Sequence, residues 1–206
     1  MIVVCATQTE YRAAQRELGS LNVRVVKTGI GRGGTFDDTA ISVGLCGGLR
    51  PGVPSGTVLV PDEIERPNGE RVACDPELAT HVRDAARQLG EAPLNAPLVT
   101  STTLVRGKNR DEWASRGFAG VDMESGLIVA PRIAVVRIIL DTPEHELSDA
   151  WLRPLGVLLR PDAWNELPWL ARTAPRYARL AAKIVRKALG GYFRDPPCHP
   201  ERSAEA

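Results

Sequence analysis

The sequence is poor in aromatic residues, in histidine and in net charge. Aromatic residues make up 5% of its 206 positions, three residues are histidine, and the formal net charge is +1. A balanced charge, without aromatic side chains interleaved among basic ones, is not expected of a protein that binds nucleic acid. The histidines and cysteines also lack the spacing of a zinc site, so neither a metal nor another bound cofactor is expected.

Cysteine is scarce as well, and long apolar runs are missing. Cys5, Cys46, Cys74 and Cys198 lie far apart and form no C-x-x-C pair, which is typical of reduced thiols in a cytoplasm. No run of 18 apolar residues could span a membrane. The apolar residues 1–6 are too few for a signal peptide and have no basic residues before them. We therefore expect a cytoplasmic protein.

What the chain does contain is a series of short apolar runs separated by helical or loop segments. Strands are expected over 2–6, 23–28, 40–48, 98–100, 120–123 and 134–140, and a turn followed by a strand over 53–61. Thr7 or Thr9 can cap a helix that stops at Gly19, and Asp75 can cap another that stops at Gly90. This alternation predicts an α/β sandwich around a largely parallel sheet.

The C-terminal part has a character of its own. Residues 167–194 include seven arginines and lysines and no acidic residue, and apolar residues recur there at helical spacing. We expect one domain over 1–160, then a basic amphipathic segment over 161–194 with a helix over 173–189, and a disordered tail over 195–206. The helix either packs on its own core or a dimer partner, or contacts a membrane surface beside Trp151, Trp164 and Trp169.

Candidate site residues lie where expected strands end. Glu10, the glycine-rich run 44–48, Glu124 and Asp141 would meet at one edge of a parallel sheet. Glu124 could accept hydrogen bonds from both hydroxyls of a ribose, with Met123 beneath the sugar. Asp141 would protonate a departing base, or else cap the turn at 141–143.

Arg137 lies in the middle of the last expected strand, where a guanidinium needs a partner. That partner is a phosphate, a carboxylate such as Glu124, or solvent.

Four segments, residues 44–49, 55–61, 121–125 and 137–141, resemble the nucleoside phosphorylase and nucleosidase superfamily in type and in order. The resemblance covers about residues 1–160 and implies a three-layer αβα sandwich with a mixed, largely parallel central sheet. It implies that Glu124 and Met123 bind the ribose, that Asp141 protonates the purine and that Glu10 activates water. By the same resemblance, the residues that line the base and ribose site are Cys46, Gly47, Leu104 and Val105.

Residues 137–147 and the basic C-terminal segment are most similar to the hopanoid-associated phosphorylases. This similarity implies release of adenine from a nucleoside with a large apolar 5′ group, such as adenosylhopane. Two alternatives stay open: a methylthioadenosine/adenosylhomocysteine nucleosidase, and a nucleoside-binding protein without catalytic activity. Gly31 and Arg32 could hold phosphate as a co-substrate, whereas Glu10 repels phosphate and favours water.

Two connections, 31–41 and 125–134, are too short for the helices that the superfamily has there. We expect their loss to expose part of the sheet and to abolish either the usual oligomer contacts or the activity itself, and we leave a homodimer open.

Overall fold

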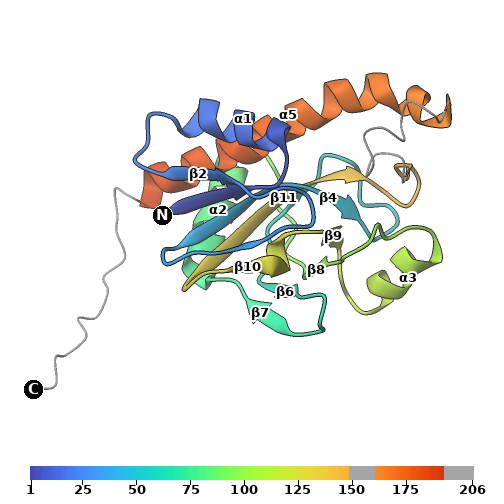
Figure 1. Ribbon diagram of the computed structural model, residues 1–206, viewed down its shortest axis with the longest axis horizontal. Coiled ribbons are helices and arrows are strands. Elements are labelled where there is room, and N and C mark those ends of the chain that lie inside the picture. The colour runs from blue at the N-terminus through green and yellow to red at the C-terminus, as the bar shows by residue number, and fades with distance from the viewer. Residues whose placement is uncertain (149–160, 193–206) are drawn as a thin grey trace, which may run out of the picture.

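The computed structural model describes residues 1–148 and 161–192 and is built around one large mixed sheet (Figure 1). The strands are β1 (Ile2–Cys5), β2 (Arg24–Lys27), β3 (Gly34–Thr35), β4 (Ala40–Gly48), β5 (Val58–Leu59), β6 (Glu63–Glu65), β7 (Arg71–Ala73), β8 (Leu98–Thr100), β9 (Gly120–Asp122), β10 (Ile128–Val129) and β11 (Ile133–Asp141). The helices are α1 (Gln8–Leu18), α2 (Pro76–Gln88), α3 (Lys108–Ser115) and α5 (Pro161–Tyr192), with a 3₁₀ turn, η1 (Ser125–Leu127).

The long strands pair in parallel. β1 lies between β2 and β4, β4 also pairs with β11, and β8 lies between β6 and β9, all in parallel register. β9 joins β4, β5 joins β11 and β7 joins β6 in antiparallel register. The mixed, largely parallel α/β sheet expected from the sequence is therefore confirmed.

The two predicted helix starts are also confirmed. Thr7 caps α1 by accepting a hydrogen bond from the Glu10 N–H, and Glu10 accepts one from Thr7 in return. Asp75 caps α2 through the Leu78 N–H, with Pro76 in the first turn. The first cap fixes Glu10 beside the carboxyl end of β1.

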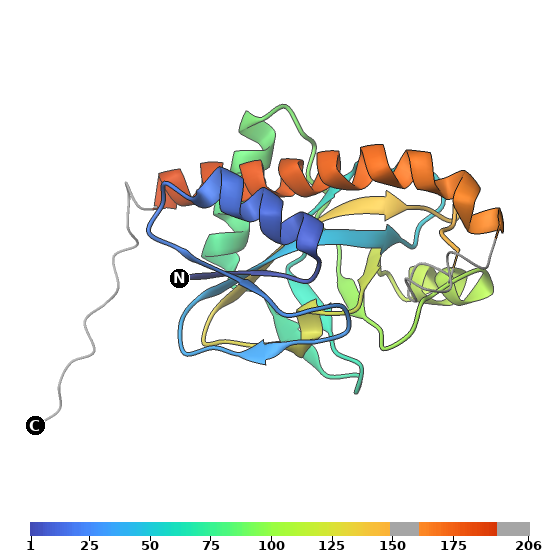
Figure 2. The ribbon, with the colours of Figure 1, turned by 45° about the horizontal axis from the view of Figure 1, so that its top comes forward.

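Helices α1, α2 and α5 pack together on one face of the sheet, and α5 runs along most of its length (Figure 2). Ile184 and Ala181 of α5 are fully buried in one apolar cluster with Val3, Ile41 and Val136 of the sheet. The apolar side of α5 thus packs on the protein's own core. The helix begins well before the predicted range 173–189. The prediction was too short because Pro168 and Pro175 lie inside the helix and weaken its helical pattern in the sequence.

The two short connections pair with each other on the other face. β3 forms a parallel ladder with β10, and the Phe36 N–H bonds to the Val129 carbonyl. The expectation that shortening exposes the sheet is wrong here, because Val135 and Ile139 beneath are fully buried in a second apolar cluster. The ladder replaces the missing cover through its own backbone hydrogen bonds and Ile128.

Several expectations concern residues that the structure does not describe. The tail 195–206 with Cys198 lies outside the described residues, as does Trp151, and the side chain of Trp164 is not described either. Within the described chain, no helix is both long enough and apolar enough to cross a membrane.

Candidate active site

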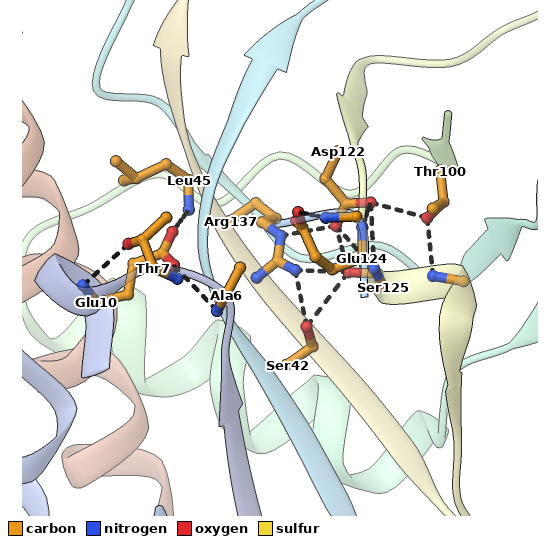
Figure 3. Close-up of polar contacts among 12 residues, drawn as sticks. Ala6, Thr7, Glu10, Ser42, Leu45, Thr100, Asp122, Glu124, Ser125 and Arg137 are labelled. Atoms are coloured by element: carbon orange, nitrogen blue, oxygen red, sulfur yellow. Dashed lines mark hydrogen bonds and ion pairs between the residues drawn. The ribbon is translucent and has the colours of Figure 1, made fainter. Parts of the chain in front are cut away.

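Glu10 is a buried carboxylate that the backbone holds in one orientation (Figure 3). Its Oε2 accepts hydrogen bonds from the N–H groups of Thr7 at 2.7 Å and Ala6 at 3.2 Å, and its Oε1 accepts one from Leu45 at 2.9 Å. These bonds join the end of β1 to the middle of β4. Glu10 is therefore both the partner of the capping residue Thr7 in α1 and an acid fixed between β1 and β4.

Arg137 is the centre of a second polar group and is only 2% exposed. Its Nε donates to Asp122 Oδ2 at 2.8 Å, and its Nη2 donates to the hydroxyl groups of Ser42 and Ser125, each at 2.8 Å. Its buried Nη1 has no hydrogen-bond partner within the described chain. A buried donor without a partner is unfavourable, which makes Nη1 available to a ligand.

Asp122 binds Arg137 most directly, and the sequence analysis did not identify it as a site residue. It also accepts hydrogen bonds from the Thr100 hydroxyl at 2.8 Å and from the backbone and hydroxyl of Ser125. Figure 3 shows Asp122 between these groups, beside Glu124. The only signal in the sequence was an aspartate inside an otherwise apolar strand.

Gly44 of β4 lies where the two polar groups meet. A side chain on Gly44 would overlap Glu10 Oε1, and its Cβ would lie 3.1 Å from Arg137 Nη1. The acid and the unpartnered guanidinium nitrogen therefore border the same small space above a glycine. Larger residues would displace one or both of them.

Glu124 completes this group. It is buried, and its Oε1 accepts a hydrogen bond from the Gly31 N–H at 2.9 Å. Burial, followed by the charge of Asp122, raises the pKa of Glu124 from its ordinary value of 4.5 to about 7, while Arg137 acts in the opposite direction. Glu10 also raises this pKa, so the two acids and Arg137 are electrostatically linked.

Asp141, expected to protonate the base or to cap a turn, lies in a separate ion pair. It is buried at the end of β11, after an irregularity in the strand, and its Oδ2 bonds to Arg110 Nη2. Arg110 is 1% exposed and also donates to the carbonyl groups of Gly48 at 2.6 Å and Val105 at 3.1 Å. Glu146 lies 3.0 Å from Arg110 Nε.

Of the residues expected to line the base and ribose site, some are half-buried and others are packed in the core. Gly47 faces the Asp141 pair, because a Cβ on it would lie 3.2 Å from Asp141 Oδ1. Met123 and Leu104 are half-buried, whereas Val105 packs in a small apolar cluster with Phe118. Cys46 is buried in the second apolar cluster, where desolvation raises the pKa of its thiol.

Gly31 and Arg32, which were expected to bind phosphate, lie in different surroundings. The N–H of Gly31 already bonds to Glu124, and Gly31 adopts a positive φ of 67° that favours glycine. Arg32 is exposed beside it. Within the described chain, no cluster of three histidine, cysteine or acidic side chains is arranged to hold a metal ion.

No protein-family profile matches the sequence, and no curated protein matches it. Solved structures do match the fold. The 5′-methylthioadenosine/S-adenosylhomocysteine nucleosidase from Neisseria meningitidis, in complex with methylthio-immucillin-A, is 15% identical with a TM-score of 0.69. That match covers 92% of this chain and 98% of the nucleosidase.

Two further structures give the same result. The futalosine hydrolase mutant from Helicobacter pylori strain 26695 is 12% identical with a TM-score of 0.66, and the match covers 92% of this chain and 98% of the hydrolase. The 5′-methylthioadenosine/S-adenosylhomocysteine nucleosidase from Colwellia psychrerythraea 34H, in complex with adenine, is 13% identical with a TM-score of 0.67, covering 92% and 93%. The chain therefore shares the fold of these nucleosidases and of this hydrolase.

Proposed function

We propose that this protein cleaves the N-glycosidic bond of an adenosine-type nucleoside and releases adenine. The observation that carries the proposal is the meeting of Glu10 and the unpartnered Arg137 Nη1 at Gly44, with Glu124 electrostatically linked to both. Two acids suit a sugar whose anomeric carbon becomes positively charged as the bond breaks, and the free donor suits the oxygen of a water nucleophile. The fold supports the same function, since the similar structures are of nucleosidases and a hydrolase.

Glu124 has the role of binding the ribose. As a carboxylate it accepts hydrogen bonds from both sugar hydroxyls, and the Gly31 N–H and the nearby Arg137 keep it oriented. Met123 lies next to it and is half-buried, so it offers an apolar surface to the sugar. Negative charge at this position also favours the developing oxocarbenium ion.

Glu10 and Arg137 together suit a water nucleophile. A carboxylate has about four acceptor positions, and three backbone N–H groups already use part of that capacity in Glu10. A water placed above Gly44 would donate to Glu10 and accept from Arg137 Nη1. Phosphate is less suitable there, because two carboxylates repel it and the Gly31 N–H already has an acceptor.

Asp141 has the role of contacting the base. Its Oδ2 is held by Arg110, and its Oδ1 would lie 3.2 Å from a Cβ added to Gly47. Proton donation to the base requires that Asp141 share a proton when substrate is bound. For the 5′ group we propose an apolar substituent such as that of adenosylhopane, with the methylthio or homocysteinyl group as the alternative.

One observation favours a second candidate, a protein that binds nucleosides without cleaving them. Arg110 donates to Asp141 Oδ2, and a guanidinium has only donors to offer, so this oxygen of Asp141 is already engaged as an acceptor. A site that keeps its sugar-binding acids but has a neutralised base-contacting acid would bind without turnover.

The test is adenine release from adenosine, methylthioadenosine, S-adenosylhomocysteine and adenosines with longer alkyl 5′ groups, each with and without phosphate. We expect release that does not require phosphate and that falls at least 100-fold in Glu124→Gln, in the range of a lost transition-state contact. Glu112→Gln, which removes an exposed carboxylate on α3, is the matched control. Nucleoside binding by calorimetry without any release would support the binding protein instead.

A further inference from the structure

The cleft between α1 and α5 is lined by arginine side chains. It has a volume of about 430 Å³, and Arg12, Arg16, Arg176 and Arg179 contribute to its walls. All four side chains are exposed, and α1 lies alongside α5 on the outer layer in both views (Figures 1 and 2). Arginine is the residue that recognises phosphate groups best, because its planar fork donates two parallel hydrogen bonds.

Most of this positive charge is not neutralised by the protein. Glu17 is the one carboxylate in the walls, and it pairs with Arg179 at 2.9 Å and with Arg186 at 3.6 Å. Arg12, Arg16 and Arg176 have no carboxylate partner within the described chain. Three cations beside one cleft, in a chain whose formal net charge is +1, make this the place for an anion.

The positive charge continues along α5 beyond the cleft. A neighbouring hollow of about 450 Å³ is bordered by Lys183, Arg186 and Lys187. Spacings of three, four and seven residues place these side chains and Arg176 along one side of the helix, over about 17 Å at 1.5 Å per residue. A stripe of this length is larger than a single free phosphate needs.

The stripe lacks the features of a nucleic-acid site. Tyr11 and Tyr177, which adjoin Arg12 and Arg176 in the sequence, are half-buried, and the Tyr177 hydroxyl is bonded to Ser55. Among the described residues of α1 and of the stripe, no exposed ring is therefore available for base stacking. The apolar side of α5 is also unavailable, because Ile184 and Val185 are fully buried in the core. Any partner must bind through charge at the surface.

We infer that α1 and α5 form a docking surface for an anionic membrane, with the arginine cleft holding a lipid phosphate. Binding is electrostatic and peripheral, without insertion of α5 into the bilayer. This inference does not depend on the proposed nucleoside cleavage, since Glu10 of α1 points away from the cleft into the site at β4.

The test is co-sedimentation of the full chain with phosphatidylglycerol vesicles and with phosphatidylcholine vesicles. We expect binding to the anionic vesicles alone, weakened by 0.5 M salt and weakened roughly tenfold or more in Arg12→Gln/Arg176→Gln. The control Arg24→Gln/Lys108→Gln removes the same charge from other elements and should bind as the wild type does.

Two outcomes would overturn the inference. An equal loss of vesicle binding in both double variants would mean that only net charge matters and that the cleft is not a binding site. Binding of inorganic pyrophosphate by calorimetry, without any binding to anionic vesicles, would identify the cleft as a site for a free phosphate compound. Folding of each variant is checked by its thermal midpoint, which should be unchanged because the replaced side chains are exposed.

Discussion

Arg110 connects three separate segments of the chain through one buried guanidinium. It bonds to Gly48 at the end of β4, to Val105 before α3 and to Asp141 at the end of β11. These are the segments expected to surround the base. A single side chain thus determines their relative positions.

We predict that Arg110→Met lowers the free energy of unfolding by about 3–5 kcal/mol, because it leaves Asp141 buried without its partner. The double variant Arg110→Met/Asp141→Asn should recover part of this loss, since the uncompensated charge is removed. Urea unfolding of the wild type, both single variants and the double variant measures the coupling. Strictly additive changes in unfolding free energy would contradict the pairing.

Glu124 makes the free energy of unfolding depend on pH, which can be measured without substrate. Its pKa is about 7 in the folded chain and has an ordinary value of 4.5, so between these values the folded state holds more protons than the unfolded state. The free energy of unfolding contributed by Glu124 therefore falls as pH rises from about 4.5 to 7. We expect the Glu124→Gln variant to show a smaller fall between pH 5 and pH 8 in urea unfolding.

Glu124 should make activity rise with pH, although it makes stability fall. Binding of the ribose requires the carboxylate form, so kcat/KM should rise with pH through about 7. A rate that is constant between pH 6 and pH 8, in an active enzyme, would remove Glu124 from the proposed role.

At this scale the sequence was informative about acids and uninformative about their partners. Glu10 and Glu124 could be identified because they follow apolar runs that read as strand and turn. Arg110 could not, because its partner Asp141 is 31 positions away and nothing local in a short polar helix indicates a buried arginine. The partner of Arg137 was left open for the same reason, and it proved to be Asp122.

The β3–β10 ladder flanks the loop that bonds to Glu124. It fixes the loop that carries Gly31, whose N–H bonds to Glu124. Gly33 lies so close to η1 that an added Cβ would overlap the Leu127 carbonyl oxygen. The position of the loop therefore depends on a glycine at 33.

We predict that Gly33→Ala lowers the free energy of unfolding by about 1–3 kcal/mol and weakens nucleoside binding, because the loop must shift away from Glu124. Gly191→Ala is the matched control, since nothing lies within 4 Å of its added Cβ. Calorimetric titration with a nucleoside and urea unfolding measure the two effects. Normal binding by a destabilised Gly33→Ala would show that the loop does not orient Glu124.

Elements with a cap or a long apolar run could be predicted from the sequence, as α1, α2, β4 and β11 were. The ladder could not, because a two-residue strand has no periodicity and its pairing depends on the distance between two loops in space. α5 was predicted too short, since Pro168 and Pro175 lower the helical signal in a segment that tertiary packing nevertheless holds as a helix.

In the molecule as a whole, α5 shares its buried cluster with the central strands. Ile184 is fully buried with Val3 of β1, Ile41 of β4 and Val136 of β11, although α5 follows them in sequence by many residues. The described chain should therefore unfold as one cooperative unit, with α5 included.

We predict that Ile184→Ala lowers the free energy of unfolding by about 2–5 kcal/mol while leaving a single transition. Lys183→Ala, at the exposed neighbouring position, should change it by no more than about 0.5 kcal/mol. Urea unfolding followed both by tryptophan fluorescence and by circular dichroism tests this. An early transition seen by one probe alone would mean that α5 detaches from the sheet independently.

The ladder also links the lengths of two connections that are far apart in the chain. Each supplies the backbone partner of the other, so an insertion that converts one of them into a helix would leave the other with an unpaired strand edge. During evolution, the connections 31–41 and 125–134 should accordingly lengthen or shorten together. A relative with one long and one short connection would present an open edge, and open edges recruit other chains.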